Sequence, residues 1–81
     1  MMFYKDADFS LAQFRDTAAF LNNHFYGNAS FYVASFQRSP IFDGSSFAKF
    51  ADLRLAFIHG NAFFDGARFD DRLSLNEAQF D

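Results

Sequence analysis

The side chains best suited to chemistry in this chain are its two histidines and two Asp-Gly pairs. His24 and His59 occupy different positions of the repeating unit described below, so we expect no shared metal site or acid–base pair. Asp43 and Asp65 each precede a glycine and lie 22 residues apart. Two stacked carboxylates could hold a cation, but Asp-Gly is also a common turn sequence, and we favour the turn.

Other catalytic signatures are missing from the sequence. Its serines occur in no Ser/His/Asp order and no GxSxG context, and no GxxxxGK or GxGxxG phosphate loop is present. The chain has no Cys, which excludes disulfides and thiolate chemistry. The sequence therefore predicts a protein that is not an enzyme and that has no catalytic, cofactor-binding or metal-binding residues.

Large apolar side chains recur along the whole chain at intervals that alternate between six and five residues. The resulting 11-residue unit is seen in KDADFSLAQFR (5–15) and DTAAFLNNHFY (16–26). A short period over a whole chain predicts a solenoid, in which each unit packs against its neighbours. The positions are Phe3, Phe9, Phe14, Phe20, Phe25, Phe31, Phe36, Phe42, Phe47, Leu53, Ile58, Phe64, Phe69, Leu75 and Phe80.

The spacing favours strands over helices. Residues five apart lie roughly 140° apart around a helix, which would scatter the large side chains around it. On a strand, residues two apart share a face, and Ala usually stands two residues before each large position, as in Ala7 and Ala51. We therefore expect a small and a large side chain to point inward on each side. The four glycines (Gly27, Gly44, Gly60 and Gly66) fall between these steps, where we expect corners with positive φ.

These Ala-x-Phe-x-x steps resemble the pentapeptide-repeat family, as in Ala7-Asp8-Phe9-Ser10-Leu11 and Ala51-Asp52-Leu53-Arg54-Leu55. The resemblance covers the entire chain and implies an all-β fold, a right-handed quadrilateral parallel β-solenoid or β-helix. The chain departs from the family in one way, because every second step carries an extra residue. Several members of that family resemble a DNA duplex and bind type II topoisomerases, which implies an alternative function as a protein-binding module.

Comparison of alternate units reveals a 22-residue super-period, which predicts about 22 residues per coil and under four coils. At about 4.8 Å per coil, the column should be about 18 Å tall. We expect one domain over residues 1–81, with no visible caps. Four internal ladders follow, with the members Phe9-Phe31-Leu53-Leu75, Phe14-Phe36-Ile58-Phe80, Phe20-Phe42-Phe64 and Phe3-Phe25-Phe47-Phe69.

The predicted function is structural, namely a scaffolding solenoid that binds copies of itself. A column without caps exposes backbone groups and core side chains at both ends, so head-to-tail stacking into an oligomer or filament is favoured. Seven empty positions between copies preserve the register, because 81 and 7 make 88, or four turns of 22. The expected end-stacking residues are Phe3, Phe9, Leu75 and Phe80, and a lateral interface is expected at Ala19, Leu21, Ile41 and Phe63. Leu11, Val33 and Leu55 form a second apolar row at a corner.

The charge of the chain distinguishes between a self-associating scaffold and a DNA mimic. The net charge is −3, with Lys and Arg interspersed among the acids. A duplex of similar height carries around ten charges, so a single copy is a poor DNA mimic. We expect no direct binding of nucleic acid. No run of about 18 apolar residues occurs, and the start MMFYKDADF resembles no secretory signal, so no membrane contact and a cytoplasmic location are expected, with export left open.

Overall fold

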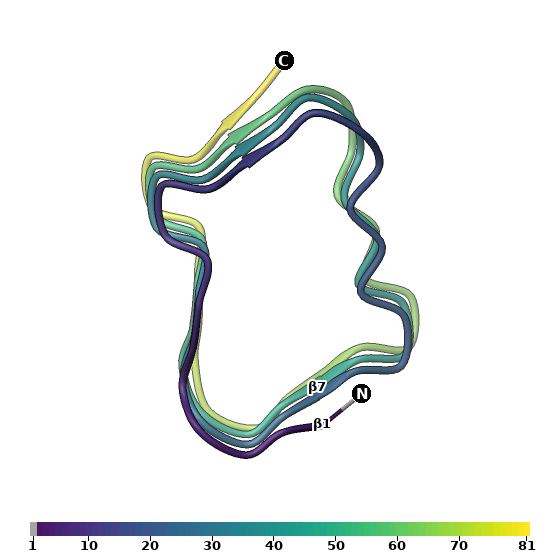
Figure 1. The fold of residues 1–81 in the computed structure, drawn as a ribbon, viewed down its shortest axis with the longest axis vertical. Coiled ribbons are helices and arrows are strands. Elements are labelled where there is room, and N and C mark those ends of the chain that lie inside the picture. The colour runs from purple at the N-terminus through teal and green to yellow at the C-terminus, as the bar shows by residue number, and fades with distance from the viewer. Residues whose placement is uncertain (1) are drawn as a thin grey trace.

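The computed structural model describes residues 2–81, and Met1, which the single-domain prediction includes, lies outside them. The chain winds into stacked coils that form three parallel sheets of four strands each (Figure 1). Sheet A contains β1 (Met2–Phe3), β4 (His24–Phe25), β7 (Ser46–Phe47) and β10 (Arg68–Phe69). Sheet B contains β2 (Ala7–Asp8), β5 (Ala29–Ser30), β8 (Ala51–Asp52) and β11 (Leu73–Ser74). Sheet C contains β3 (Gln13–Phe14), β6 (Ser35–Phe36), β9 (Phe57–Ile58) and β12 (Gln79–Phe80).

Every strand pairs with the strand one coil away, and the partners are 22 residues apart. Phe3 pairs with Phe25, Phe25 with Phe47, and Phe47 with Phe69. The fourth side of the coil has only isolated parallel bridges, which join Ala19 to Ile41 and Ile41 to Phe63. Pro40 lies on this side and has no N–H to donate, which limits regular pairing there. The prediction of a four-sided parallel β-solenoid with 22 residues per coil is confirmed.

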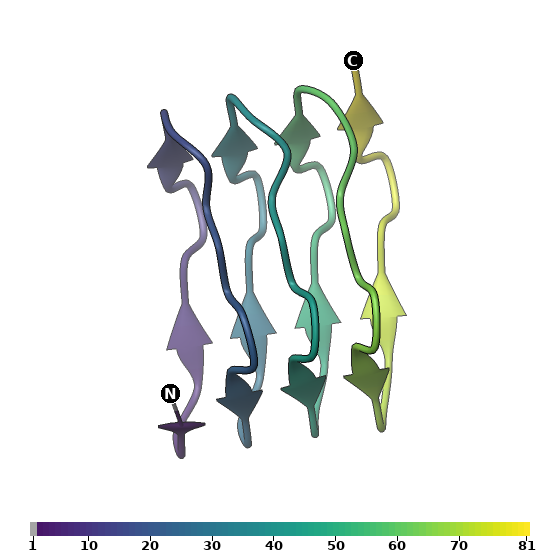
Figure 2. The same cartoon turned by 90° about the vertical axis from the view of Figure 1, so that its right-hand side faces the viewer.

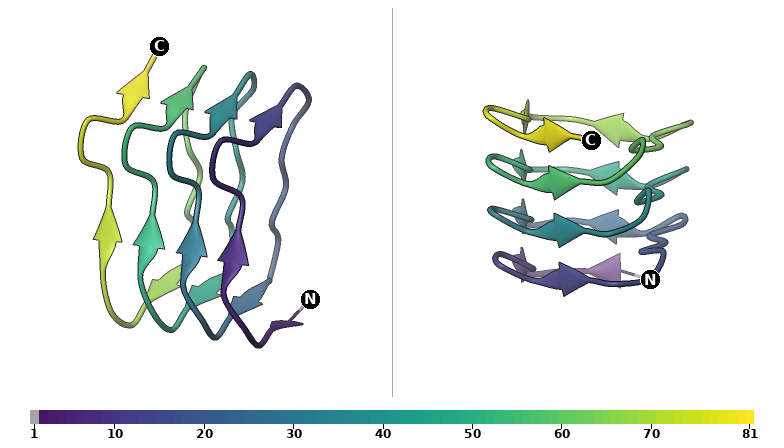
Figure 3. Two further views of the ribbon diagram at one scale, coloured as in Figure 1. Left: turned by 60° about the vertical axis from the view of Figure 1, so that its left-hand side comes forward. Right: turned by 90° about the horizontal axis from the view of Figure 1, so that it is seen from above.

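The coil is right-handed, because the chain in Figure 1 runs clockwise while it recedes from the N-terminal coil toward the C-terminal coil. Figures 2 and 3 show the coils as a stack, with the two termini at opposite ends. The Cα positions extend over 29 × 19 × 17 Å, and the shortest of these axes runs along the stack. The height agrees with the value expected from the repeat.

The alternation of five and six residues corresponds to two kinds of corner. Each step of five begins with a tight turn, in which Ala12 N–H donates to Phe9 O at 3.2 Å and Ala34 N–H donates to Phe31 O at 3.0 Å. The steps of six pass through wider bends without such a turn bond. The extra residue therefore changes the corner and leaves the stacking of the sides intact.

The core consists of the four predicted ladders and the Ala residues beside them. Phe31, Phe36, Phe42 and Ile58 are fully buried, as are Ala34, Ala51 and Ala56. Aromatic rings of successive coils stack nearly parallel, for example Phe14 on Phe36 with centroids 4.8 Å apart and planes inclined by 4°. Rings on opposite sides of the coil meet edge-on, as for Phe31 and Phe42. The inward position of the repeated large residues is confirmed.

Candidate functional site

The two end coils expose part of the aromatic core. Phe80 is 50% exposed and Leu75 is 38% exposed, whereas Phe36 and Ile58 on the same ladder as Phe80 are 0% exposed. At the opposite end, Phe3 and Phe9 are half-buried. These are the four residues expected at stacking ends, and the structure places one pair on each end coil. Within residues 2–81, each of these four side chains has a ladder neighbour on one side only.

The same coils carry open backbone edges. In inner coils, the N–H groups of Ala51 and Leu53 donate to Arg72 O and Ser74 O of the following coil, at 2.8 and 2.9 Å. The equivalent N–H groups in the last coil belong to Leu73 and Leu75, and no coil follows within residues 2–81. The strands β10, β11 and β12 are therefore edge strands, as are β1, β2 and β3. An open parallel edge can accept a further strand by main-chain hydrogen bonding.

The predicted lateral row lies on the fourth side. Ala19, Ile41 and Phe63 stack through the isolated bridges, and Leu21 lies in the turn that follows Phe20. Phe63 is 42% and Leu21 is 52% exposed, while Ile41 is half-buried. The row points outward as expected, and its role as an interface stays a prediction.

The apolar row at the corner has positive φ, a conformation that we expected only at the glycines. Leu11, Val33 and Leu55 have φ of 63°, 59° and 59°, and the corresponding residue in the last coil is Glu77. All four occupy the third position of the tight turn, which calls for φ > 0 and normally selects Gly or Asn. The matching corner between the fourth side and sheet A carries Asn22, Gly44 and Gly66 instead. Both corners occupy the same position of the 11-residue unit, so a positive φ at the apolar corner could have been predicted from the Asn and Gly residues at the other.

One glycine was interpreted wrongly. Gly44, Gly60 and Gly66 have positive φ, but Gly27 does not. A Cβ at Gly27 would lie 2.6 Å from Asp6 Oδ1 and 2.7 Å from the Asp6 nitrogen. Gly27 is thus required by the close approach of the preceding coil, where Asp6 Oδ1 accepts the N–H of Asn28 at 2.8 Å.

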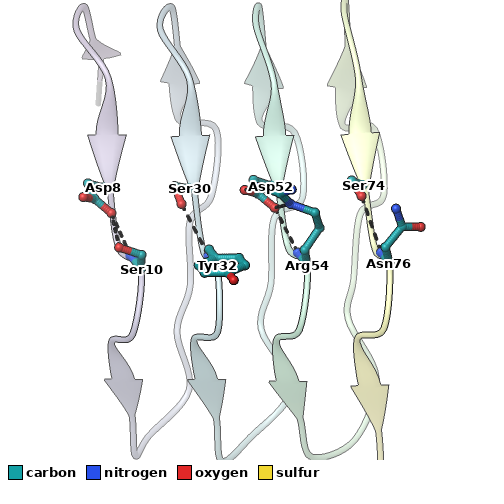
Figure 4. Close-up of polar contacts among 8 residues, drawn as sticks. All are labelled: Asp8, Ser10, Ser30, Tyr32, Asp52, Arg54, Ser74 and Asn76. Atoms are coloured by element: carbon teal, nitrogen blue, oxygen red, sulfur yellow. Dashed lines mark hydrogen bonds and ion pairs between the residues drawn. The ribbon is translucent and has the colours of Figure 1, made fainter.

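A polar column on sheet B stabilises the corner that follows it (Figure 4). Asp8 Oδ1 accepts the N–H of Ser10 at 2.9 Å, and Asp52 Oδ1 accepts the N–H of Arg54 at 3.0 Å. Ser30 and Ser74 accept the equivalent N–H groups at 3.4 Å. These polar residues therefore cap turns, which explains why every second unit carries Asp or Ser at this position.

An Arg-aromatic cluster beside this column was missed by sequence reasoning. The Arg72 guanidinium lies 4.2 Å from the Phe50 ring centroid, and Arg54 lies 5.3 Å from the centroid of Tyr32. Arg54 also donates two hydrogen bonds of 2.8 Å to the two carboxylate oxygens of Asp52. These bonds lower the pKa of Asp52 and raise that of Arg54. Arg54 is thus held by the carboxylate of Asp52, whereas Arg72 packs on the Phe50 ring.

The two histidines lie on different sides of the coil. His24 lies on sheet A with its Nδ1 2.8 Å from Ser46 Oγ, while His59 follows sheet C with its Nδ1 3.9 Å from Asp81 Oδ2. Asp43 and Asp65 stack as expected, and Asp43 Oδ1 accepts the N–H of Asp65 at 3.0 Å. Among residues 2–81 there is no group of three or more His, Cys, Asp or Glu side chains that could hold a metal ion. That part of the chain also contains no helix long and apolar enough to cross a membrane.

Comparison of the chain with protein-family models, with curated proteins and with solved structures found no match. The similarity to pentapeptide repeats therefore stays a prediction that rests on the Ala-x-Phe steps, while the right-handed parallel β-solenoid is a property of the structure itself.

Proposed function

We propose that this protein is a structural solenoid that associates with copies of itself by stacking its end coils head to tail. The observation that carries the proposal is the state of the two end coils, which combine open β edges with partly exposed core rings. A second copy supplies both missing elements, because its first coil has the same cross-section as the last coil of the first copy. Such a contact joins unlike ends, so it repeats without limit and produces a filament.

The chemistry of the two ends supports this mode of association. Burying Leu75 and Phe80 at an end contact removes apolar surface from water, which contributes about 25 cal/mol per Å². Edge N–H and C=O groups gain partners at the same time, so apolar and polar contacts are made over one surface. The lateral row containing Phe63 offers a further contact between neighbouring columns, since adjacent exposed apolar side chains mark protein–protein interfaces.

The alternative, a DNA mimic that binds a type II topoisomerase, is less well supported. Mimicry requires continuous rows of free acidic groups, with about one charge per 1.7 Å of duplex. In this structure Asp52 pairs with Arg54, and Asp70 lies 3.4 Å from Arg68. The acidic positions of the described surface are thus partly neutralised by the chain itself.

Sedimentation velocity over a range of protein concentrations, together with electron microscopy, tests the proposal. Mean assembly size should grow with concentration, and the rods should repeat axially every four coils, or about 19 Å. A comparison variant carries a folded domain fused after Asp81, which blocks the C-terminal coil. This variant should form short species at most. A parent chain that stays monomeric at all concentrations refutes self-association, and equally long rods from the fused variant refute end stacking.

A further inference from the structure

The charges on the two end coils define how the copies fit together. Building on the head-to-tail stacking proposed above, we infer that residues 2–15 of one copy lie over residues 68–81 of the next, each facing the residue 66 positions later in its partner. This register continues the observed ladders, because Phe3 of the second copy follows Phe69 of the first just as Phe69 follows Phe47. Phe9 likewise follows Leu75, and Phe14 follows Phe80.

In this register the charged residues that face each other have opposite signs. Lys5 lies over Asp71, Asp6 over Arg72, and Arg15 over Asp81. All of these side chains are exposed in the single copy. No two residues of like charge face each other across the contact, although six charged residues of the last coil and four of the first take part. The remaining charged positions face Met2, Tyr4, Ser74 and Leu11.

Other registers lack this fit. A rotation by one side places a step of six residues over a step of five, so the corners no longer align. The register half a coil earlier aligns the steps, but residues 2–4 of the second copy would occupy the space held by residues 79–81 of the first. The inferred register is therefore the closest approach that preserves the corners and avoids overlap.

The fourth side behaves differently from the other three. Its ladder ends at Phe64, and the next rung would be residue 86 of a continuous column, which falls within the seven empty positions between the copies. A second copy therefore does not continue all four ladders. Three ladders gain a direct neighbour, while Phe64 and Phe20 of the next copy border a notch of seven residues.

Charge reversal at one facing pair tests the register. Lys5→Asp alone places two carboxylates opposite each other, and Asp71→Lys alone places two ammonium groups opposite each other. Each variant should therefore associate with itself about 3- to 10-fold more weakly than the parent. In a mixture of the two variants, alternating copies have complementary charges at every junction. At every second junction the new carboxylate of one variant meets the new ammonium group of the other, and at the junctions between them the parental pair is restored.

The mixture should recover association relative to either variant alone and form alternating rods. Arg38→Asp is the matched control, since it changes the net charge like Lys5→Asp but lies on an inner coil, where its side chain is exposed. This control should associate as the parent does.

The measurement is sedimentation equilibrium of each variant and of the mixture at low and high salt, with circular dichroism to verify the fold. Electrostatic contacts on the surface are screened within about 10 Å at 0.1 M salt, so the differences should shrink as salt is added. Recovery in the mixture supports the register. Variants that associate as well as the parent, or a mixture as weak as its components, overturn the register while end stacking itself stands. A monomeric parent instead refutes the proposed function.

Discussion

Replacing Phe36 by Ala tests whether the stacked rings stabilise the column. Phe36 is fully buried on sheet C, between Phe14 and Ile58 on its own ladder, and its ring centroid lies 4.8 Å from that of Phe14 and 5.9 Å from that of Phe31. The substitution leaves a cavity with neighbours on every side, and the coils above and below are held by their own hydrogen bonds. Little collapse is therefore possible, and the expected loss is about 3–5 kcal/mol.

The loss should be judged against the whole free energy of unfolding. At about 0.05–0.15 kcal/mol per residue, a chain of this size is stable by about 4–12 kcal/mol. Phe80→Ala is the matched comparison, because Phe80 is the end rung of the same ladder and is 50% exposed. Half of its ring is already in water and no partner covers it, so its removal should cost about 1–2 kcal/mol in the single copy.

Equilibrium unfolding in guanidinium chloride, followed by circular dichroism at concentrations where the chain is monomeric, measures both values. Phe36→Ala should lower the midpoint by about 1–2 M, given the slopes usual for small domains. Equal losses for Phe36→Ala and Phe80→Ala would contradict the difference in burial. A Phe36→Ala midpoint within error of the parent would refute the ladder as the source of stability.

Three further outcomes are expected. Phe63→Asp should keep the β-sheet circular dichroism of the parent, since Phe63 points outward, and should weaken lateral association measured by light scattering. An unfolded variant would contradict the outward orientation of the Phe63 side chain. Leu11→Gly should raise the free energy of unfolding by about 0.5–1 kcal/mol. Leu11 has φ of 63° and is 71% exposed, so the relief of backbone strain exceeds the lost packing. Clear destabilisation would show that the Leu11 side chain packs on the coil. The lowered pKa of Asp52 means that its carboxylate stabilises the fold above the unfolded pKa of about 4 and that this stability is lost as pH falls through the folded pKa. Asp52→Asn should therefore reduce the loss of stability below about pH 4, and an unchanged pH profile in denaturant titrations would refute the role of Arg54.

The candidate association surfaces were only partly predictable. The exposure of Leu75 and Phe80 follows from their place in the last coil, and the outward direction of Phe63 follows from its distance of one residue from Phe64. Alternation on a strand is sufficient for both inferences. The packing of Arg72 on Phe50 was not predictable, because a long Arg side chain can reach solvent, a neighbouring acid or a ring from one backbone position.

The backbone conformation of the corners was likewise only partly predictable. The sequence placed turns between the Ala-x-Phe steps, but it assigned positive φ to glycines alone. In the structure, Leu11 and Val33 also have positive φ, whereas Gly27 does not. Backbone conformation at a corner depends on hydrogen bonds to the adjacent coil and on the approach of side chains such as Asp6, and both are contacts between residues about 22 positions apart.

The solenoid, its register and its core follow from the sequence alone, because a strict period forces equivalent residues to stack and only one face of each strand repeats large apolar side chains. Which polar groups pair, and which corners carry strain, became known only from the folded coils. Asp52 and Arg54 are close in sequence, but their paired hydrogen bonds need the tight turn that lies between the two sheets. Periodicity specifies which residues become neighbours, whereas the direction of a side chain and the sign of φ are settled only when the coils close on one another.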